Sequence, residues 1–291
     1  MLSVSAERGT LVIKGQDCRT ASLEKVCKIG AKGVIPTWAL LGDSHAETLS
    51  DSLSQYLEQR NLAADVLTYP ACPFVLGIEP VSSTEKCAQF TESVMRRIEA
   101  SAIKTVVIND RVTAYMLGSR FDNQEGGVEP GEPFPMRVVG RINSDETGRI
   151  AGVKTALATT IETLLAHGLH VIYIAPVPEV GWHVPHAVVK LAANGSLPLT
   201  TSLDVYTKRH AQTFDVLRKF DANPSFLVVY PEDVFCSRDN GRCVTHTENR
   251  LLYTDTDHLS KEGAAQLVGH MAKIVQAWED AGMNKKVGDQ K

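Results

Sequence analysis

Short apolar runs alternate along the chain with longer stretches in which apolar residues recur every three or four positions. The runs predict buried strands, and the longer stretches predict amphipathic helices. The predicted strands cover residues 38–41, 64–68, 105–108, 171–175 and 226–230, with a further strand possible at 10–13. The predicted helices cover residues 45–59, 87–100, 151–167, 203–221 and 261–281. This alternation predicts a three-layer α/β/α domain with a parallel central sheet.

Two of the predicted helices carry an apolar stripe that identifies the side facing the core. The stripe residues recur at four-residue intervals along each helix. They are Leu49, Leu53 and Leu57 in the first helix and Phe90, Val94 and Ile98 in the second. We assign the three leucines to the core rather than to a functional site.

We treat residues 1–291 as a single domain with two irregular regions. Residues 1–36 are expected to form an N-terminal lead-in that contains a disulfide loop. Residues 118–150 form a polar stretch rich in glycine and proline. This stretch is longer than the ~12–15 residues usual for a connection without secondary structure. We interpret it as a loop insertion, which could serve as a substrate lid or partner surface, or could be disordered.

The composition is that of an ordinary globular protein, with 43% hydrophobic and 22% charged residues. The net charge of −4 and the lack of a long basic run argue against nucleic acid as the main partner. No apolar run approaches the ~18 residues that a membrane span needs, and residues 1–15 lack the apolar core of a signal peptide. The chain is therefore expected to be cytoplasmic or to be part of an exported protein.

The six cysteines bear on that choice. They form three pairs that are close in sequence: Cys18 with Cys27, Cys72 with Cys87, and Cys236 with Cys243. Six cysteines allow fifteen pairings, and the sequence alone does not select among them. We favour three local disulfides over metal binding, because no pair has the Cys-x-x-Cys spacing of a structural zinc site. Disulfides imply an oxidising compartment, and with no signal peptide they suggest a piece of a longer membrane-anchored protein.

The first predicted strand runs into Gly42-Asp43-Ser44-His45, where the chain turns into a helix. A serine at this junction exposes its hydroxyl at the carboxyl edge of the sheet. Its N–H lies beside the first free N–H groups of the helix, which are suitable donors to an oxyanion. The alternative is that Ser44 only caps the helix, which serine also does well. His45 is expected to shape the turn.

A second polar motif lies near the C-terminus, where Asp255 precedes His258 by three residues. A serine nucleophile needs an imidazole base and a carboxylate that orients the base. In a turn this spacing can bring the carboxylate to one ring nitrogen and leave the other for Ser44. Asp257 is a less favoured alternative, because a side chain one residue before His258 would usually point elsewhere. The histidines at 167, 170, 210, 246 and 270 are expected at the surface or at helix ends.

Together these two motifs resemble the first and last signature blocks of the SGNH (GDSL-like) hydrolase superfamily. The chain is more narrowly similar to the periplasmic SGNH domain fused to the C-terminus of bacterial integral-membrane O-acyltransferases of the acyltransferase-3 type. The resemblance extends from Cys18 to Trp278. Besides the outer blocks, it rests on Ala71-Cys72-Pro73 with Cys87, on Ala175-Pro176-Val177-Pro178-Glu179, and on the pair Cys236 and Cys243.

The resemblance implies a flavodoxin-like SGNH fold and a Ser44, His258, Asp255 triad. It also implies three oxyanion donors. One is the Ser44 N–H, and a second comes from the loop after the second strand, where Ala71, Cys72 and Gly77 are candidates and we select Gly77. The third is Asn109, which stands in the place of the asparagine of the superfamily's Gly-x-Asn-Asp block. Here Val107 replaces the glycine of that block, so a buried asparagine that satisfies a turn is the alternative.

The resemblance also implies a function. It suggests an O-acetyltransferase that acts on a sugar hydroxyl of a bacterial cell-surface glycan such as lipopolysaccharide O-antigen. The acyl group would come through a transmembrane acyltransferase domain of the same chain, and the domain would be periplasmic and tethered to the inner membrane, with no metal or cofactor. Glu179, Trp182 and His183 follow a strand end and are candidates for binding the glycan acceptor, with a sugar stacked on the indole. The alternatives are a free-standing carbohydrate O-acetyl esterase and a non-catalytic glycan-binding module.

Overall fold

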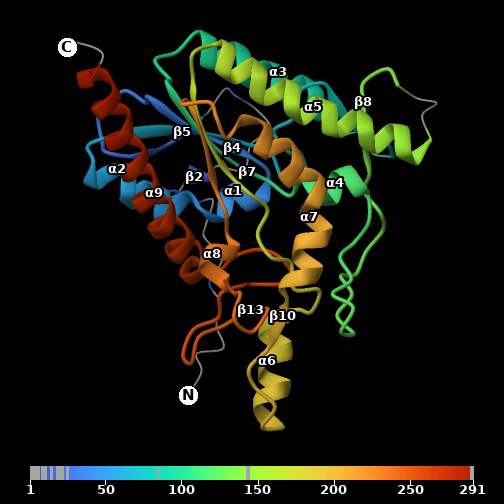
Figure 1. The fold of residues 1–291 in the computed structure, drawn as a ribbon. Coiled ribbons are helices and arrows are strands. Elements are labelled where there is room, and N and C mark those ends of the chain that lie inside the picture. Colours follow the sequence, from blue (N-terminus) through green and yellow to red (C-terminus); the bar gives the residue numbers. More distant parts are fainter. Residues whose placement is uncertain are drawn as a thin grey trace.

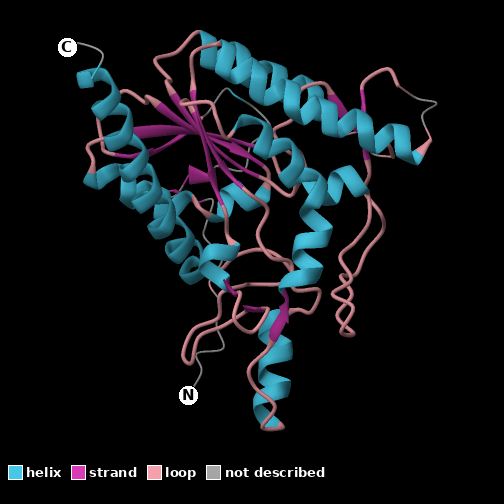
Figure 2. Ribbon diagram, in the orientation of Figure 1, coloured by secondary structure: helices cyan, strands magenta, loops and turns pink. Residues whose placement is uncertain are grey.

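A computed structural model of the chain provides the three-dimensional framework for these expectations. It describes residues 7, 12–13, 16–17, 23, 26–82, 84, 86–141 and 145–288, with side chains in the last helix described as far as residue 281. In this part of the chain, strands and helices alternate around one large sheet (Figures 1 and 2). The predicted three-layer α/β/α architecture is confirmed.

The large sheet has six strands in the order β11-β9-β7-β4-β5-β3. Their bounds are β3 Cys27–Gly30, β4 Trp38–Gly42, β5 Ala63–Thr68, β7 Thr105–Asn109, β9 His170–Ile174 and β11 Phe226–Val229. Neighbouring strands are parallel except at one edge, where β3 pairs antiparallel with β5. The five predicted strands are therefore correct, but the region expected to be a lead-in, residues 1–36, also contributes an additional strand, β3, to this sheet. An antiparallel strand at the edge of a parallel sheet is common in α/β proteins.

Strand β4 occupies a central position and is covered on both faces. Its Gly42 pairs with Thr68 of β5 on one side and with Asn109 of β7 on the other. Leu40 and Leu41 are completely buried and point into different core clusters. This is the pattern expected of a strand packed between two helical layers. The segment after β4 therefore leaves the sheet from its middle.

Helices cover both faces of the sheet (Figure 1). On one face the core is built with α3 Cys87–Glu99, α4 Val112–Leu117, α5 Glu146–Ala166 and α7 Leu203–Leu217. On the other face it is built with α2 Ser50–Gln59, α6 Val184–Ala193 and α9 Lys261–Gly288. The six predicted stripe residues of α2 and α3 and of the turn before α2 are all buried.

Several helix boundaries differ from those predicted, and α4 and α6 lie where no helix was predicted. The first helix is divided at Leu49 into α1 Ser44–Thr48 and α2. The helix predicted at 151–167 begins earlier, because the Asp145 side chain accepts a hydrogen bond from the Gly148 N–H at 2.8 Å and caps α5. The segment 118–150 therefore contains the start of α5 as well as β8 Met136–Val138, which pairs with β6 Ile78–Pro80. Part of the predicted loop insertion therefore has regular structure.

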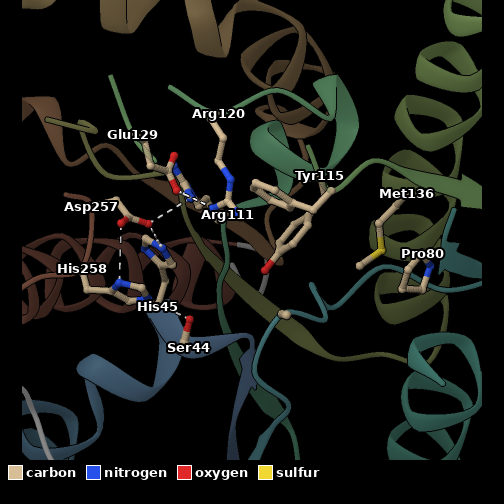
Figure 3. A pocket seen from close by; sticks show the side chains of 12 residues that line it. Ser44, His45, Pro80, Arg111, Tyr115, Arg120, Glu129, Met136, Asp257 and His258 are labelled. Carbon is tan, nitrogen blue, oxygen red and sulfur yellow. Dashed lines mark hydrogen bonds and ion pairs between the residues drawn. The ribbon is translucent and has the colours of Figure 1, made fainter. Parts of the chain in front are cut away.

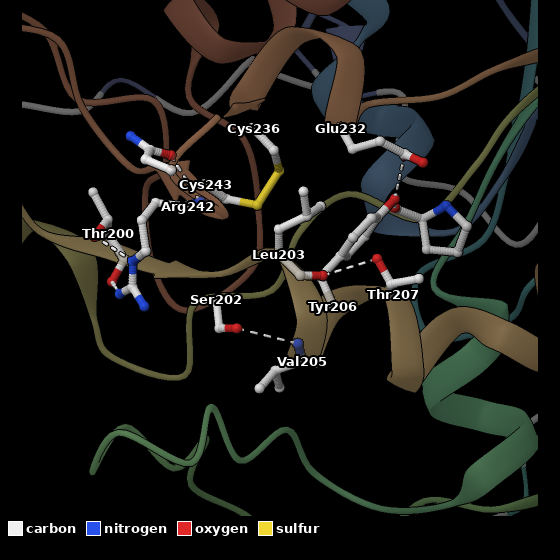
Figure 4. Close-up of a disulfide and its surroundings, with 12 residues drawn as sticks. Thr200, Ser202, Leu203, Val205, Tyr206, Thr207, Glu232, Cys236, Arg242 and Cys243 are labelled. Atoms are coloured by element: carbon white, nitrogen blue, oxygen red, sulfur yellow. Dashed lines mark hydrogen bonds between the residues drawn. A yellow bond between two sulfur atoms is a disulfide. The ribbon is translucent and has the colours of Figure 1, made fainter. Parts of the chain in front are cut away.

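Two of the three predicted disulfides are present. Cys72–Cys87 joins the loop after β5 to the first residue of α3, with 5.4 Å between the Cα atoms. Cys236–Cys243 joins β12 Cys236–Ser237 to β13 Arg242–Val244 (Figure 4). The hairpin pairs further with β10 Thr200–Ser202. The predicted Cys18–Cys27 bond falls outside the described residues, because Cys18 does.

The described residues contain no helix that is both long and apolar enough to cross a membrane.

Candidate active site

Ser44 is the first residue of α1, directly after the turn that follows β4. Asp43 caps this helix, since its carboxylate accepts a hydrogen bond from the His45 N–H at 2.8 Å. The capping role considered for Ser44 therefore belongs to its neighbour. The Ser44 side chain instead points to His258, with 2.8 Å between Oγ and Nε2.

His258 is held on its other side by Asp255. The imidazole Nδ1 lies 2.9 Å from Asp255 Oδ2, and the His258 backbone N–H donates to Asp255 Oδ1 at 2.8 Å. Burial opposes ionisation of Asp255, but its bond to His258 outweighs this and lowers the pKa of the carboxyl. The three residues therefore have the geometry of a nucleophile, a base and the carboxylate that orients the base.

A cavity of about 290 Å³ opens beside Ser44 and His258 (Figure 3). One side is polar and the other carries the apolar groups of Ala71, Pro80, Tyr115, Phe134 and Met136. The remaining lining residues are Ser44, His45, Arg111, Arg120, Glu129, Asp257 and His258. Arg120, Glu129, Phe134 and Met136 all come from the segment 118–150. The stretch expected to be an insertion thus forms a wall of the cavity.

The three expected oxyanion donors are placed differently from one another. Ser44 lines the cavity, and as the first residue of a helix its N–H lacks an acceptor one turn earlier. Gly77 is not among the lining residues. Its carbonyl accepts a hydrogen bond from the Val139 N–H, just after β8. In its place Ala71 lines the cavity, with a positive φ of 62°. Of the three loop candidates, only Ala71 lines the cavity.

Asn109 is buried at the end of β7 and is likewise absent from the cavity lining. Its side-chain amide donates to the Ile174 carbonyl on β9 at 3.2 Å. This is the alternative considered for it, a strand-end asparagine that satisfies neighbouring backbone. The structure does not direct this amide group at Ser44.

The three residues expected to bind the acceptor also lie away from the cavity lining. Glu179 is buried, Trp182 packs against Gly127, and His183 is exposed at the start of α6, where its ring stacks on His186. The reason is that the stretch after β9 folds against the triad loop. The N–H groups of Val180 and Val184 donate to the carbonyls of Thr256 and Asp255, at 2.8 Å and 3.1 Å. This stretch therefore packs against the loop that contains Asp255 and His258 and leaves the cavity lining to other residues.

Arg111 is the most connected side chain of the site, and sequence reasoning missed it. It is buried, and its guanidinium donates to Glu129 and to Glu179, with Nε 2.8 Å from Glu179 Oε1. Its NH1 also lies 3.2 Å from Asp257 Oδ2. Arg209 forms a second ion pair with Glu179. The available signal was the pair of charged residues, Asp110 and Arg111, that follows the buried strand β7.

Two further buried carboxylates were also missed as parts of the site: Asp43, within the serine turn, and Asp110, directly after β7. Asp43 Oδ2 accepts hydrogen bonds from the Arg111 N–H at 3.1 Å and from the Tyr115 hydroxyl at 2.9 Å. Asp110 accepts from the N–H groups of Phe74 and Val112, at 3.0 Å and 3.1 Å. Burial, with the nearby charge of Asp43, raises the pKa of Asp110 to about 7.

One of the remaining histidines is placed differently from expectation. His210 is buried within α7, with Nδ1 2.8 Å from the Thr113 hydroxyl. Burial lowers its pKa to about 3, so it is neutral at ordinary pH. The sequence around His210 is polar and did not predict its burial. The burial depends on packing against α4, which contains Thr113.

His45, Asp257 and His258 have ligand atoms within 4.8 Å of one another, which is the spacing of a possible metal site. Both ring nitrogens of His258 are already engaged by Ser44 and Asp255. His45 Nε2 lies 3.2 Å from Asp257 Oδ2, so these two groups bind each other. Among the described residues, this cluster is accounted for as a hydrogen-bonded network.

Comparison with known proteins relates the chain to a family and to solved structures. Residues 16–273 match the model of the SGNH domain that is fused to AT3 domains. The periplasmic domain of a lipopolysaccharide acetyltransferase from Salmonella ser. Paratyphi A shares the fold, with a TM-score of 0.59 and 16% identity over 84% of this chain and 85% of that one. A GDSL-like lipase from Bacteroides thetaiotaomicron gives a TM-score of 0.44 and 12% identity over 84% and 88% of the two chains. A search of curated protein sequences gave no match.

Proposed function

The chain belongs to the family of SGNH domains fused to AT3 domains, and we propose that it transfers an acetyl group to a sugar hydroxyl of a bacterial cell-surface glycan. Ser44 is the nucleophile, His258 the base, and Asp255 the carboxylate that orients the base. The observation that carries this proposal is the continuous chain of contacts from Ser44 Oγ through His258 to Asp255, at 2.8 Å and 2.9 Å.

The reaction proceeds in two halves. Ser44 Oγ attacks the acyl carbonyl while His258 Nε2 takes the hydroxyl proton, and the leaving oxygen then receives that proton as the acyl-enzyme forms. In the second half a sugar hydroxyl gives its proton to His258 and attacks the acyl carbon. The ester of the sugar forms as the bond to Ser44 breaks, and His258 returns the proton to Ser44 Oγ. Water in place of the sugar gives hydrolysis by the same steps.

The N–H groups of Ser44 and Ala71 are the donors that we assign to the tetrahedral oxyanion. Ser44 presents a helix N-terminal N–H, and Ala71 lines the same cavity with its backbone in the left-handed region. Donors fixed in place before the reaction stabilise the developing charge without reorganisation, and one such donor contributes about 3 kcal/mol. The apolar side of the cavity, with Phe134 and Met136, suits an acetyl methyl group or the apolar face of a sugar.

The glycan acceptor and the membrane partner are inferred from the family. Fusion to AT3 domains supports a transmembrane acyltransferase domain in the same chain as the route by which the acyl group arrives. The structurally similar Salmonella domain belongs to a lipopolysaccharide acetyltransferase, which supports lipopolysaccharide O-antigen or a similar glycan as acceptor. The two disulfides agree with a periplasmic location, tethered to the inner membrane.

Hydrolysis of para-nitrophenyl acetate tests the triad. Ser44→Ala and His258→Ala are expected to abolish it. Ser50→Ala is the matched control, because Ser50 is a buried serine close in sequence whose hydroxyl has no hydrogen-bond partner among the described residues. Thermal unfolding of each variant verifies that it is folded. Activity that survives in Ser44→Ala would refute the triad, and activity in no form of the protein would favour a glycan-binding module.

Acceptor use is tested by adding de-O-acetylated lipopolysaccharide to the same reaction. Acetyl groups recovered on the glycan by mass spectrometry support transfer. Release of acetate alone, with the glycan unmodified, would support the carbohydrate esterase instead.

A further inference from the structure

A second carboxylate, Asp257, lies beside the imidazole that Asp255 orients. Its Oδ1 is 3.6 Å from His258 Nδ1, whereas Asp255 Oδ2 is 2.9 Å from the same nitrogen. The Asp257 side chain is only 6% exposed. Such a buried group is expensive to ionise unless it is paired, so its partners decide what it does.

Three groups hold Asp257 in its charged form. His45 Nε2 and Arg111 NH1 each lie 3.2 Å from Oδ2 (Figure 3). The Thr256 hydroxyl donates to Oδ1 at 2.7 Å. Burial opposes ionisation, but the hydrogen bond from His45 and the charge of Arg111 outweigh it. They hold the pKa of Asp257 well below its usual range. A fixed negative charge therefore lies close to the catalytic imidazole.

His45 also contacts His258 directly. The two rings stack with centroids 4.5 Å apart and planes inclined by 28°. Since Asp257 binds His45 on one side and faces His258 on the other, it fixes the relative position of the two rings. His45 does more than shape the turn, because it forms one wall of the space in which His258 can move.

Arg111 connects Asp257 to the rest of the cavity. The same guanidinium binds Glu129 of the segment 118–150 and Glu179 of the stretch behind the triad loop. Glu179 is held in turn by Arg209. Asp255 and Asp257 thus lie close to His258, His45 stacks on its ring, and Arg111 lies behind Asp257.

We propose that Asp257 is a second positioning carboxylate for His258, held in place by Arg111 and His45. It acts through the imidazole and does not contact the substrate. Its charge stabilises the imidazolium that forms when His258 takes the proton of Ser44, and its bond to His45 keeps the stacked ring in place. This inference rests on the proposed function, in which His258 is the base.

Nuclear magnetic resonance of protein labelled with ¹⁵N-histidine tests the inference without requiring turnover. The His258 signals are assigned with His258→Gln, and the midpoint of the imidazole titration is measured in each variant. Asp257→Asn removes the charge but keeps the shape, and it should lower the midpoint by about one pH unit, as expected for the loss of an opposite charge this close. Asp65→Asn is the matched control, because Asp65 is also buried and paired with an arginine, Arg97. It should leave the midpoint unchanged.

A second variant keeps the test decisive if Asp257→Asn does not fold. Thr256→Val removes the hydroxyl that shares the charge of Asp257 Oδ1 and should move the midpoint upward, by less than one unit. Opposite shifts in the two variants support the inference, as does the Thr256→Val shift alone if Asp257→Asn is unfolded. An unchanged midpoint in a folded variant, Asp257→Asn or Thr256→Val, would overturn it.

The kinetic effect separates positioning from stability. Asp257→Asn should lower kcat for para-nitrophenyl acetate by about ten- to a hundredfold, with KM unchanged and with the acid limb of kcat/KM moved to lower pH. Asp255→Asn should cost far more, on the order of 10⁴-fold. If Asp257 served stability alone, the melting temperature of Asp257→Asn would fall while the acid limb stayed where it is in the wild-type protein. If Ser44→Ala were as active as the wild type, the proposed function would fail. The His258 titration would still show whether the charge of Asp257 acts on the imidazole.

Discussion

Gly42 lies directly against the backbone of Asn109. A Cβ atom on Gly42 would be 2.0 Å from the Asn109 carbonyl oxygen and 2.9 Å from the carbonyl carbon. Gly42 also has a φ of +135°, which residues with side chains rarely adopt. Because the two residues are paired at the ends of β4 and β7, their close approach determines where the chain turns toward Ser44.

Gly42→Ala is therefore expected to destabilise the fold and displace the nucleophile. A cost of about 2–4 kcal/mol is typical when strain and a backbone clash act together, and turnover should fall with it. Urea unfolding and hydrolysis of para-nitrophenyl acetate provide the measurements. Gly33→Ala is the control, since Gly33 has a positive φ of 76° but no atom within 4 Å of its added Cβ. An equal loss of unfolding free energy in both variants would show that the contact with Asn109 does not contribute to stability.

Asp110 should make stability depend on pH. Its pKa is raised from 3.8 to about 7, so the folded state keeps a proton that the unfolded chain releases. The stabilisation from this proton is complete below pH 3.8 and is lost as pH rises through about 7. The difference in unfolding free energy between the wild type and Asp110→Asn should fall across this range, as measured by urea unfolding at several pH values. A difference that is constant with pH would contradict the assignment.

Glu179 should stabilise the fold by pairing with Arg111 and Arg209. Burial opposes its ionisation, but the two guanidinium groups outweigh it and lower the pKa to about 2. Glu179→Gln breaks a buried pair and is expected to cost about 3–5 kcal/mol near neutral pH. The stabilisation is present above pH 4.5 and is lost as pH falls toward 2, so the cost should shrink in acid.

The control for this variant is Glu125→Gln, which breaks the more exposed pair with Arg242. Exposed pairs contribute at most about 1 kcal/mol. Urea unfolding of both variants makes the comparison. Equal losses of unfolding free energy in the two variants would indicate that the buried ion pairs around Arg111 stabilise the fold no more than an exposed pair does.

Phe134 should matter for binding more than for chemistry. Its ring lines the cavity, contacts Tyr115 edge to face at 5.2 Å, and lies under the guanidinium of Arg120 at 4.2 Å. Phe134→Ala removes this apolar wall, and we expect KM for the acyl ester to rise about tenfold with a smaller change in kcat. Phe220→Ala, in an aromatic pair with Phe226 outside the cavity lining, is the control. A change in kcat without a change in KM would argue against a binding role.

The sequence was sufficient to predict the features that depend on local pattern. The five parallel strands follow from short apolar runs, and the core stripes of α2 and α3 follow from their spacing. The contact of His258 with Asp255 agrees with the motif, because a three-residue turn brings the two side chains together locally. The contact of Ser44 with His258 joins segments 214 residues apart, and it was expected from the pairing of the two motifs rather than from local pattern. The antiparallel strand β3 was missed because four residues of mixed burial carry too little pattern.

Features built from distant segments could not be predicted in this way. The partners of Arg111 come from three stretches, at Glu129, Glu179 and Asp257, and no spacing in the sequence connects them. The choice of Ala71 over Gly77 depends on a left-handed alanine, whereas glycine is the residue that sequence reasoning expects there. Glu179 pointed to an acceptor site from its position after a strand, but the ion pairs with Arg111 and Arg209 turn it inward.

Intact-protein mass spectrometry after brief exposure to para-nitrophenyl acetate tests the central claim most directly, because the account requires a covalent acetyl group on Ser44. The wild-type protein should gain the mass of one acetyl group, and peptide mapping should locate it on Ser44. His258→Ala should acquire it far more slowly, and Ser44→Ala should not acquire it at all. An acetyl group located on another residue, or equal labelling of the wild type and Ser44→Ala, would contradict the account.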